Sequence, residues 1–208
     1  TLPAGRPLTN CTYYPKPRIK SIDVMHRKIT LVTIALATLF FGQQTYALSV
    51  AASAGNNSYG VEASQRLLPT LRGSIGYMHS DDSGRHADIN SASLMFTPPL
   101  PVLDLSVGTR YQYMDTGFGS GGGFGLAGSA FVPTPIPLTS IGGFGSYTPD
   151  AFTHGNLEES YEFGVQARVN LFSQTYLHGG YRYFRTEFEG QGSQTLDSGP
   201  VFGISAGF

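Results

Sequence analysis

The chain has 208 residues and nearly balanced charge, with 13 Lys and Arg against 14 Asp and Glu. Residues 48–208 contain no Lys and no Cys, and their seven arginines against thirteen acidic residues leave a net charge of −6. This composition excludes disulfide and zinc-thiolate sites from that part of the chain. It also disfavours nucleic-acid binding, which depends on a basic surface.

The first 47 residues have the pattern of an export leader. Residues 1–24 contain four prolines and no apolar periodicity, and we interpret them as an upstream or unstructured segment. Residues 25–47 begin with a basic stretch at Met25, continue with an uncharged apolar run and end in small residues. This is typical of a secretory signal peptide with a helical centre, and it predicts cleavage after Ala47. Residues 48–208 are then expected to form one domain.

Strand-length segments of alternating apolar and polar residues fill the rest of the chain. The first two, 49–55 and 58–65, flank Asn56 and Asn57, which tolerate the backbone conformations of tight hairpins. Alternation is clearest over 103–113 and 161–171. Similar segments occupy 71–77, 91–96, 123–132, 139–147, 177–183 and 196–208. We expect ten strands, with eight strands plus an unpaired N-terminal segment as the alternative.

Two kinds of connection alternate between these segments. Short and mostly Pro-rich turns occupy 67–70, 98–101, 133–137 and 172–174. Longer polar segments occupy 79–90, 114–122, 148–158 and 189–195. Outer-membrane barrels have short periplasmic turns and longer extracellular loops, so the first kind is predicted to face the periplasm.

Charged residues in the middle of the predicted strands lie on the polar face. On a membrane barrel this face points inward, and the predicted lumenal residues are Arg72, Asp104, Arg110, Glu162, Arg168 and Arg182. No apolar run after Ala47 is long enough for a spanning helix, and only a closed barrel satisfies the backbone of strands in lipid. The sequence therefore predicts an all-β fold, a closed antiparallel up-and-down transmembrane barrel. An ordinary soluble all-β domain is the alternative.

The last segment, 196–208, predicts the cellular location of the protein. Leu196 and Phe208 share one face of the expected strand, and small or polar residues occupy the other. A terminal strand of this kind is typical of the outer membrane of Gram-negative bacteria. Its predicted sorting signal, read by the barrel-assembly machinery, is Phe202, Ile204, Ala206 and Phe208. Outer-membrane lipid is the other expected partner.

The sequence also resembles a known family. The stretch 179–184 (GGYRYF), the C-terminal stretch 197–208 (DSGPVFGISAGF), the segment 158–162 (EESYE) and the early loop 79–84 (HSDDSG) are similar to YfaZ-type outer-membrane proteins. The resemblance covers residues 48–208 and is strongest in the last third. It implies a small outer-membrane β-barrel of undefined molecular role, and it supplies no catalytic residues.

One polar loop contains residue types that bind metal ions. The candidates for a divalent-cation site are His79, Asp81, Asp82, His86 and Asp88. Asp and Gly also serve turns, and we interpret this segment as a solvated loop without a metal or cofactor. Together with Asp81 and Asp82, Asp150 and His154 are the candidates for hydrolysis at the barrel rim, although nothing in the sequence fixes their geometry.

The leading hypothesis is a non-enzymatic barrel, either structural or a narrow porin-like channel with a charged lumen. The first alternative is an enzyme acting at the rim, a protease or lipid A modifier. The second is an adhesin-like module that binds through 114–122 and 148–158. The solute, the partner and the oligomeric state stay open.

Overall fold

The computed structural model describes residues 48–82, 85–117, 119–172 and 174–208. The predicted leader 1–24, the signal peptide and its cleavage site at Ala47 lie outside these residues. The elements in chain order are β1 (Leu48–Ala54), β2 (Ser58–Leu68), β3 (Leu71–Asp82), β4 (Arg85–Phe96), β5 (Asp104–Thr116), β6 (Gly119–Pro133), β7 (Thr139–Thr148), η1 (Asp150–Phe152), β8 (Thr153–Gly155), β9 (Leu157–Phe172), β10 (Thr175–Phe188) and β11 (Gly192–Gly207). No helix in this part of the chain is long and apolar enough to cross a bilayer.

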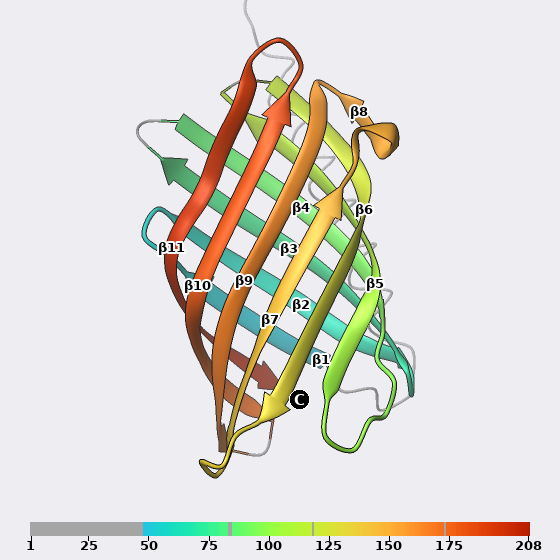
Figure 1. Cartoon of the computed structure of the whole chain (residues 1–208), viewed down its shortest axis with the longest axis vertical. Helices are drawn as coiled ribbons and strands as arrows, with labels where there is room; N and C mark the ends of the chain where they lie inside the picture. The colour runs from blue at the N-terminus through green and yellow to red at the C-terminus, as the bar shows by residue number, and fades with distance from the viewer. Residues whose placement is uncertain (1–47, 83–84, 118, 173) are drawn as a thin grey trace, which may run out of the picture. The chain divides into compact units, whose positions relative to one another are not determined.

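Ten of the strands form a closed antiparallel barrel (Figure 1). Around the ring the order is β5-β4-β3-β2-β1-β11-β10-β9-β7-β6, and pairing of β5 with β6 completes the circle. The short β8 pairs with the first part of β6 and lies outside the ring. The prediction of a ten-strand barrel is confirmed. The alternative with an unpaired N-terminal segment is wrong, because β1 pairs with both β2 and β11.

The barrel has two ends that differ in their connections. We call the end that joins β2 to β3, β4 to β5, β6 to β7 and β9 to β10 the turn end, and the opposite end the loop end. Both the first and the last strand reach the turn end, where the Phe208 amide donates a hydrogen bond to the Leu48 carbonyl (2.8 Å). The excursion through η1 and β8 lies at the loop end (Figure 1).

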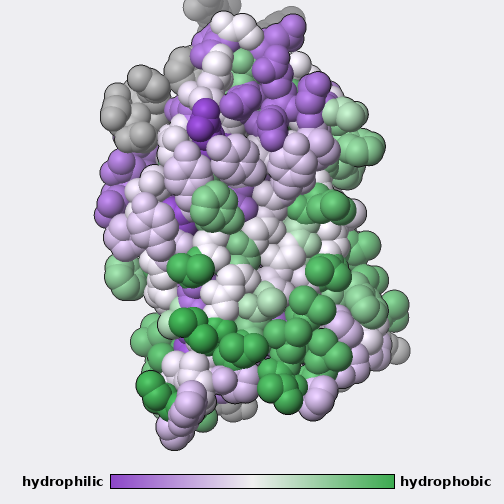
Figure 2. Space-filling view, viewed as in Figure 1, coloured by the Kyte–Doolittle hydropathy of each residue, from purple (hydrophilic) through white to green (hydrophobic). Residues whose placement is uncertain are grey.

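The outer wall is apolar over only part of its height. Figure 2 shows apolar side chains gathered near the turn end and hydrophilic ones covering the loop end. Strand β9 has 16 residues. At about 3.3 Å per residue and a tilt of roughly 40°, such a strand rises about 40 Å, which exceeds the ~25 Å apolar band of outer-membrane barrels. The strands therefore continue past the lipid at the loop end, where outward polar residues are solvated.

Three of the four predicted long loops are wrong, and only 148–158 corresponds to a long connection, 149–156, which contains η1 and β8. Strand β3 extends to Asp82 and β4 begins at Arg85, so most of 79–90 is hairpin, and β5 and β6 likewise occupy most of 114–122. The longest connection between two consecutive ring strands at either end, apart from 149–156, is 97–103 at the turn end. The reason is that a strand beyond the lipid does not need apolar residues on its outward face. Its polar sequence therefore looks like a loop.

A β-bulge in β11 changes which residues face inward. The pairing of β10 with β11 shifts register after Phe184, which lies opposite Asp197, whereas Arg185 lies opposite Thr195. The extra residue is Leu196, and both Leu196 and Asp197 are buried. The expectation that Leu196 shares the outward face of Phe208 is therefore wrong, because a bulge reverses the alternation at one point.

Eight buried apolar residues fill the barrel interior toward the loop end. They come from six strands and form one cluster, which we call the apolar plug: Met78, Ala87, Ile89, Met114, Leu157, Phe184, Phe188 and Leu196. Each is at most 9% exposed. The sequence analysis did not identify this plug, because these residues occur singly among polar neighbours in the halves of the strands nearer the loop end.

Candidate functional site

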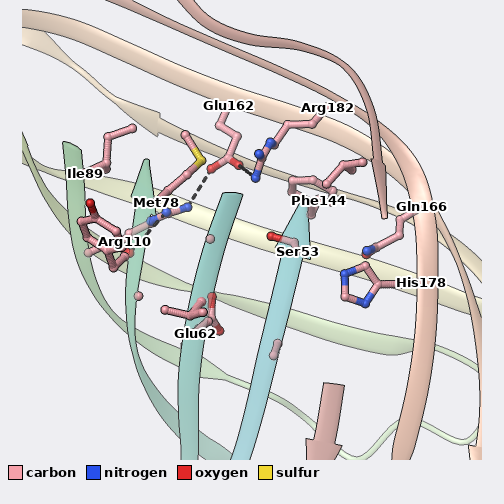
Figure 3. A pocket seen from close by; sticks show the side chains of 17 residues that line it. Ser53, Glu62, Met78, Ile89, Arg110, Phe144, Glu162, Gln166, His178 and Arg182 are labelled. Atoms are coloured by element: carbon pink, nitrogen blue, oxygen red, sulfur yellow. Dashed lines mark hydrogen bonds and ion pairs between the residues drawn. The ribbon is translucent and has the colours of Figure 1, made fainter. Parts of the chain in front are cut away.

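Below the apolar plug, charged side chains meet across the lumen (Figure 3). Glu162 on β9 lies between two arginines, with its Oε2 2.7 Å from Arg110 Nη1 and its Oε1 4.0 Å from Arg182 Nη1. Arg182 also donates through Nη2 to Asp197 Oδ2 at 2.6 Å. We call Arg110, Glu162, Arg182 and Asp197 the charge network. Because its acids and arginines alternate, each buried charge has an opposite charge beside it.

Neutral groups complete the hydrogen bonding of this network. The Ser58 hydroxyl donates to Asp197 Oδ2 at 2.8 Å and accepts from Arg182 Nη2 at 2.8 Å. On the other side of the lumen, Arg110 Nη2 lies 3.4 Å from the Ser91 hydroxyl. Buried charges are tolerated only when paired and hydrogen-bonded, and these contacts meet that condition. The network therefore connects β2, β4, β5, β9, β10 and β11 through the interior.

Two cavities lie between this network and the turn end. The upper cavity, of about 260 Å³, contains the charge network pair Arg110 and Glu162 in its wall. The lower one, of about 550 Å³, is the larger, and we call it the lower chamber. Four residues line both cavities: Ala51, Glu62, Gln166 and His178. The two spaces are therefore neighbours along the lumen.

The lower chamber has the remaining lumenal arginines in its wall. Arg168 Nη1 lies 3.5 Å from Asp104 Oδ2, and the Arg168 guanidinium stacks 3.3 Å above the ring of the buried Phe131. Arg66 and Arg72 line the same chamber from β2 and β3. An arginine held against an aromatic ring keeps its position without complete neutralisation by an acid.

All six charges predicted for the lumen line one of the two cavities. Arg110, Glu162 and Arg182 line the upper cavity, and Arg72, Asp104 and Arg168 line the lower chamber. Sequence reasoning did not single out Arg66, Glu62 or Asp197. For Arg66 and Glu62 the signal was present, because Glu62, Ser64 and Arg66 alternate with Val61, Ala63 and Gln65. For Asp197 the signal was present as well, because it shares the polar face of its strand with Gly199, and the bulge changed the facing of Leu196 only.

The His and Asp residues of the first predicted loop lie near the end of the β3–β4 hairpin. His79 Nδ1 lies 2.8 Å from Asp88 Oδ1, which also accepts a hydrogen bond from the Tyr77 hydroxyl at 2.5 Å. His86 Nδ1 lies 3.5 Å from Asp81 Oδ2. Among the residues that the structure describes, no group of three or more His, Cys, Asp or Glu could hold a metal ion. The side chain of Asp82 lies outside this description.

The candidate rim residues are divided between two places. His154 on β8 lies 3.0 Å from the Tyr111 hydroxyl, and its ring stacks on that of Tyr111. Asp81 pairs with His86 on the β3–β4 hairpin. Within residues 85–117 and 119–172, neither hydrogen bonds nor ion pairs link His154 to Asp150. The structure therefore does not assemble these residues into one hydrolytic site.

The comparisons with known proteins gave one family and several solved structures. The model of a family described as YfaZ precursor matches residues 26–208. No curated protein matches the chain. A bacterial polysaccharide outer-membrane secretin is similar with a TM-score of 0.43 and 12% identity, over 75% of this chain and 57% of the secretin. This chain thus spans little more than half of that protein's length.

Two further solved structures are matched over almost their whole length. The N-terminal β-barrel domain of Pseudomonas aeruginosa OprF has a TM-score of 0.38 and 8% identity, over 78% of this chain and 97% of that domain. A major outer membrane protein from Thermus thermophilus has a TM-score of 0.34 and 14% identity, over 79% of this chain and 100% of that protein. Since the family model covers far more than half of the sequence, this ten-strand outer-membrane β-barrel belongs to the YfaZ precursor family.

Proposed function

We propose that this protein is a structural, non-enzymatic barrel of the outer membrane whose lumen is sealed against solutes. The observation that carries the proposal is the apolar plug. Met114 and Phe188 are 0% exposed, and Ile89, Phe184 and Leu196 are 1% exposed. Side chains packed so that water cannot reach them leave no hydrated path for an ion between them. In small barrels the interior is narrow enough for side chains to close it, and here they do so at the level of the apolar plug.

The charge network supports the seal from below. It places Arg110 and Arg182 on either side of Glu162, so the charges neutralise one another inside the lumen. A row of paired charges offers a passing ion no free partner, whereas a selective pore needs sites that an ion can enter and leave. The lower chamber then ends blindly at this level. We place the turn end in the periplasm, since the apolar part of the wall adjoins it (Figure 2).

A narrow, gated channel is the second candidate. It is favoured by the adjacency of the two cavities, which share Glu62 and His178 in their walls. On this hypothesis, the charge network and the apolar plug would have to separate together to open a path. That requires breaking Arg110–Glu162 and exposing Phe184 and Leu196 to water in one step.

Single-channel recording in a planar bilayer tests the seal. We expect no defined conductance steps from the folded chain. The variant Arg110→Ala should also be silent, because it removes a charge below the plug and leaves the plug intact. Migration on gels without boiling would verify that both proteins are folded before recording. Reproducible steps from the wild-type chain would refute the sealed barrel, and steps from Arg110→Ala alone would favour the gated channel.

An assay of lipid A and peptide hydrolysis tests the non-enzymatic part of the proposal. We expect no turnover by the folded chain, because His154 and the His79–Asp88 pair are engaged in separate contacts. The variants His79→Ala, His86→Ala and His154→Ala serve as comparisons. Turnover by the wild-type chain that disappears in one of these variants would show a rim enzyme instead.

A further inference from the structure

Two arginines lie directly opposite each other at the wall of the lower chamber. Arg66 on β2 and Arg72 on β3 are register partners across the ladder, and both line the chamber. Directly opposed residues on one face of an antiparallel pair have Cβ atoms about 5 Å apart, and like charges in this position are destabilising. Both side chains are exposed at the chamber wall, so an anion from solution can reach them and relieve this repulsion.

The described residues do not supply a compensating negative charge through an ion pair. Glu162 and Asp197 pair with Arg110 and Arg182 in the charge network, and Asp104 lies beside Arg168. Neither Arg66 nor Arg72 forms an ion pair within the described part of the chain. Glu62 lies in the same wall but also borders the upper cavity with Arg110. The chamber wall thus holds three arginines and two acids, with a positive excess on the Arg66–Arg72 side.

The chamber has the size and lining of a small-molecule site. Its volume of about 550 Å³ falls in the usual range for pockets that hold small molecules, roughly 300–1,000 Å³. Neutral hydrogen-bonding groups complete the wall, including Ser64, Ser140, Gln166, Gln174 and His178. Arg168 is already oriented by the ring of Phe131. A charged cavity with fixed donors is suited to an oxyanion that is itself charged and rich in acceptors.

We propose that the lower chamber binds the phosphate-type oxyanion of a soluble molecule, which bridges Arg66 and Arg72. Two guanidinium forks on adjacent strands can each donate two parallel hydrogen bonds to one tetrahedral anion. The anion would neutralise the opposed arginines and convert their repulsion into a bridge between β2 and β3. The site lies in the lower chamber, between the charge network and the turn end. Conductance steps from the barrel would therefore refute the proposed seal, but they would not refute anion binding in this chamber.

Isothermal titration calorimetry of the full chain, folded in an uncharged detergent, tests the site. Inorganic phosphate is titrated at constant ionic strength, with chloride as the balancing anion. We expect saturable binding that Arg66→Gln and Arg72→Gln each weaken about tenfold or more, because each loses charge-assisted hydrogen bonds to the anion. The control Arg185→Gln removes an arginine that pairs instead with Glu187, and it should bind phosphate like the wild type.

Further arms keep the test decisive. Migration on gels without boiling establishes that each variant is folded. Arg72→Lys retains the positive charge but lacks the guanidinium fork, so its affinity for phosphate should lie between those of the wild type and Arg72→Gln. Titration is repeated in mixed micelles with phosphatidylglycerol and with phosphatidylcholine. Loss of phosphate binding only with phosphatidylglycerol would assign the site to a lipid headgroup and overturn the soluble ligand. The absence of saturable binding, or wild-type affinity in both Gln variants, would overturn the site altogether.

Discussion

Arg110 on β5 and Glu162 on β9 meet at 2.7 Å, although β6 and β7 lie between their strands in the ring. This contact therefore crosses the lumen and does not run along the wall. It links two parts of the barrel that share no backbone hydrogen bonds. Such a link stabilises the closed cross-section, because separation of the two walls would leave charges unpaired in an interior of low dielectric constant.

Removing the central acid of the charge network is expected to destabilise the barrel. The variant Glu162→Gln leaves Arg110 and the buried Arg182 without their shared carboxylate. Loss of one partner from a buried ion pair costs about 3–5 kcal/mol, and we expect the lower part of this range because the Arg110 side chain is 25% exposed. Unfolding by guanidinium chloride in detergent measures the change. The partly exposed pair Arg185–Glu187 provides the control, since Glu187→Gln should change stability by less than about 1 kcal/mol. Equal effects of the two variants would show that the network does not stabilise the barrel.

The apolar plug is expected to contribute more stability than lipid-facing aromatic residues. Phe184 is 1% exposed inside the plug, whereas Phe172 is 74% exposed at the turn end. Phe184→Ala should lower the free energy of unfolding by about 3–5 kcal/mol, because it leaves a cavity among packed side chains. Phe172→Ala leaves no internal cavity and should cost much less. A loss in Phe184→Ala no larger than that in Phe172→Ala would mean that the plug is loosely packed.

One glycine of β10 is expected to be essential for strand pairing. A Cβ atom added at Gly180 would collide with the carbonyl oxygen of Val165 on the neighbouring strand β9. Gly180→Ala should therefore prevent closure or shift the pairing of β9 with β10, and it should abolish the faster migration of the unboiled protein. At Gly117 an added Cβ meets nothing within 4 Å, so Gly117→Ala should migrate like the wild type. Normal migration of Gly180→Ala would contradict this close approach.

The C-terminal aromatic residue is expected to affect assembly in cells more than stability. Phe208 is 78% exposed, so Phe208→Ala removes little packing. Refolding in detergent should be nearly unchanged, whereas the amount of folded barrel in outer-membrane fractions should fall several-fold if the assembly machinery reads this residue. Val107→Ala is a matched exposed apolar control on another strand. Unchanged levels of the Phe208→Ala variant in outer-membrane fractions would refute the predicted sorting role.

Local pattern was sufficient to predict the strands and their inward and outward faces. In β9, for example, Glu162 and Arg168 alternate with Phe163 and Val169, and the structure places the two charged residues on cavity walls and leaves the two apolar residues exposed. The predicted facing was wrong at Leu196, where the strand departs from strict alternation and the sequence gives no local sign of it. This departure is the bulge, whose position depends on how β10 pairs with β11.

The sequence by itself predicted an antiparallel outer-membrane barrel with a charged interior, since period two and lipid-facing residues are properties of each strand alone, whereas the choice between ten and eight strands depended on the pairing of β1. Only the tertiary structure decided which charges meet, that Arg66 lies opposite Arg72, and that single apolar residues from six strands converge into a plug. The physical reason is that register and barrel closure set the distances between strands. No single strand carries that information.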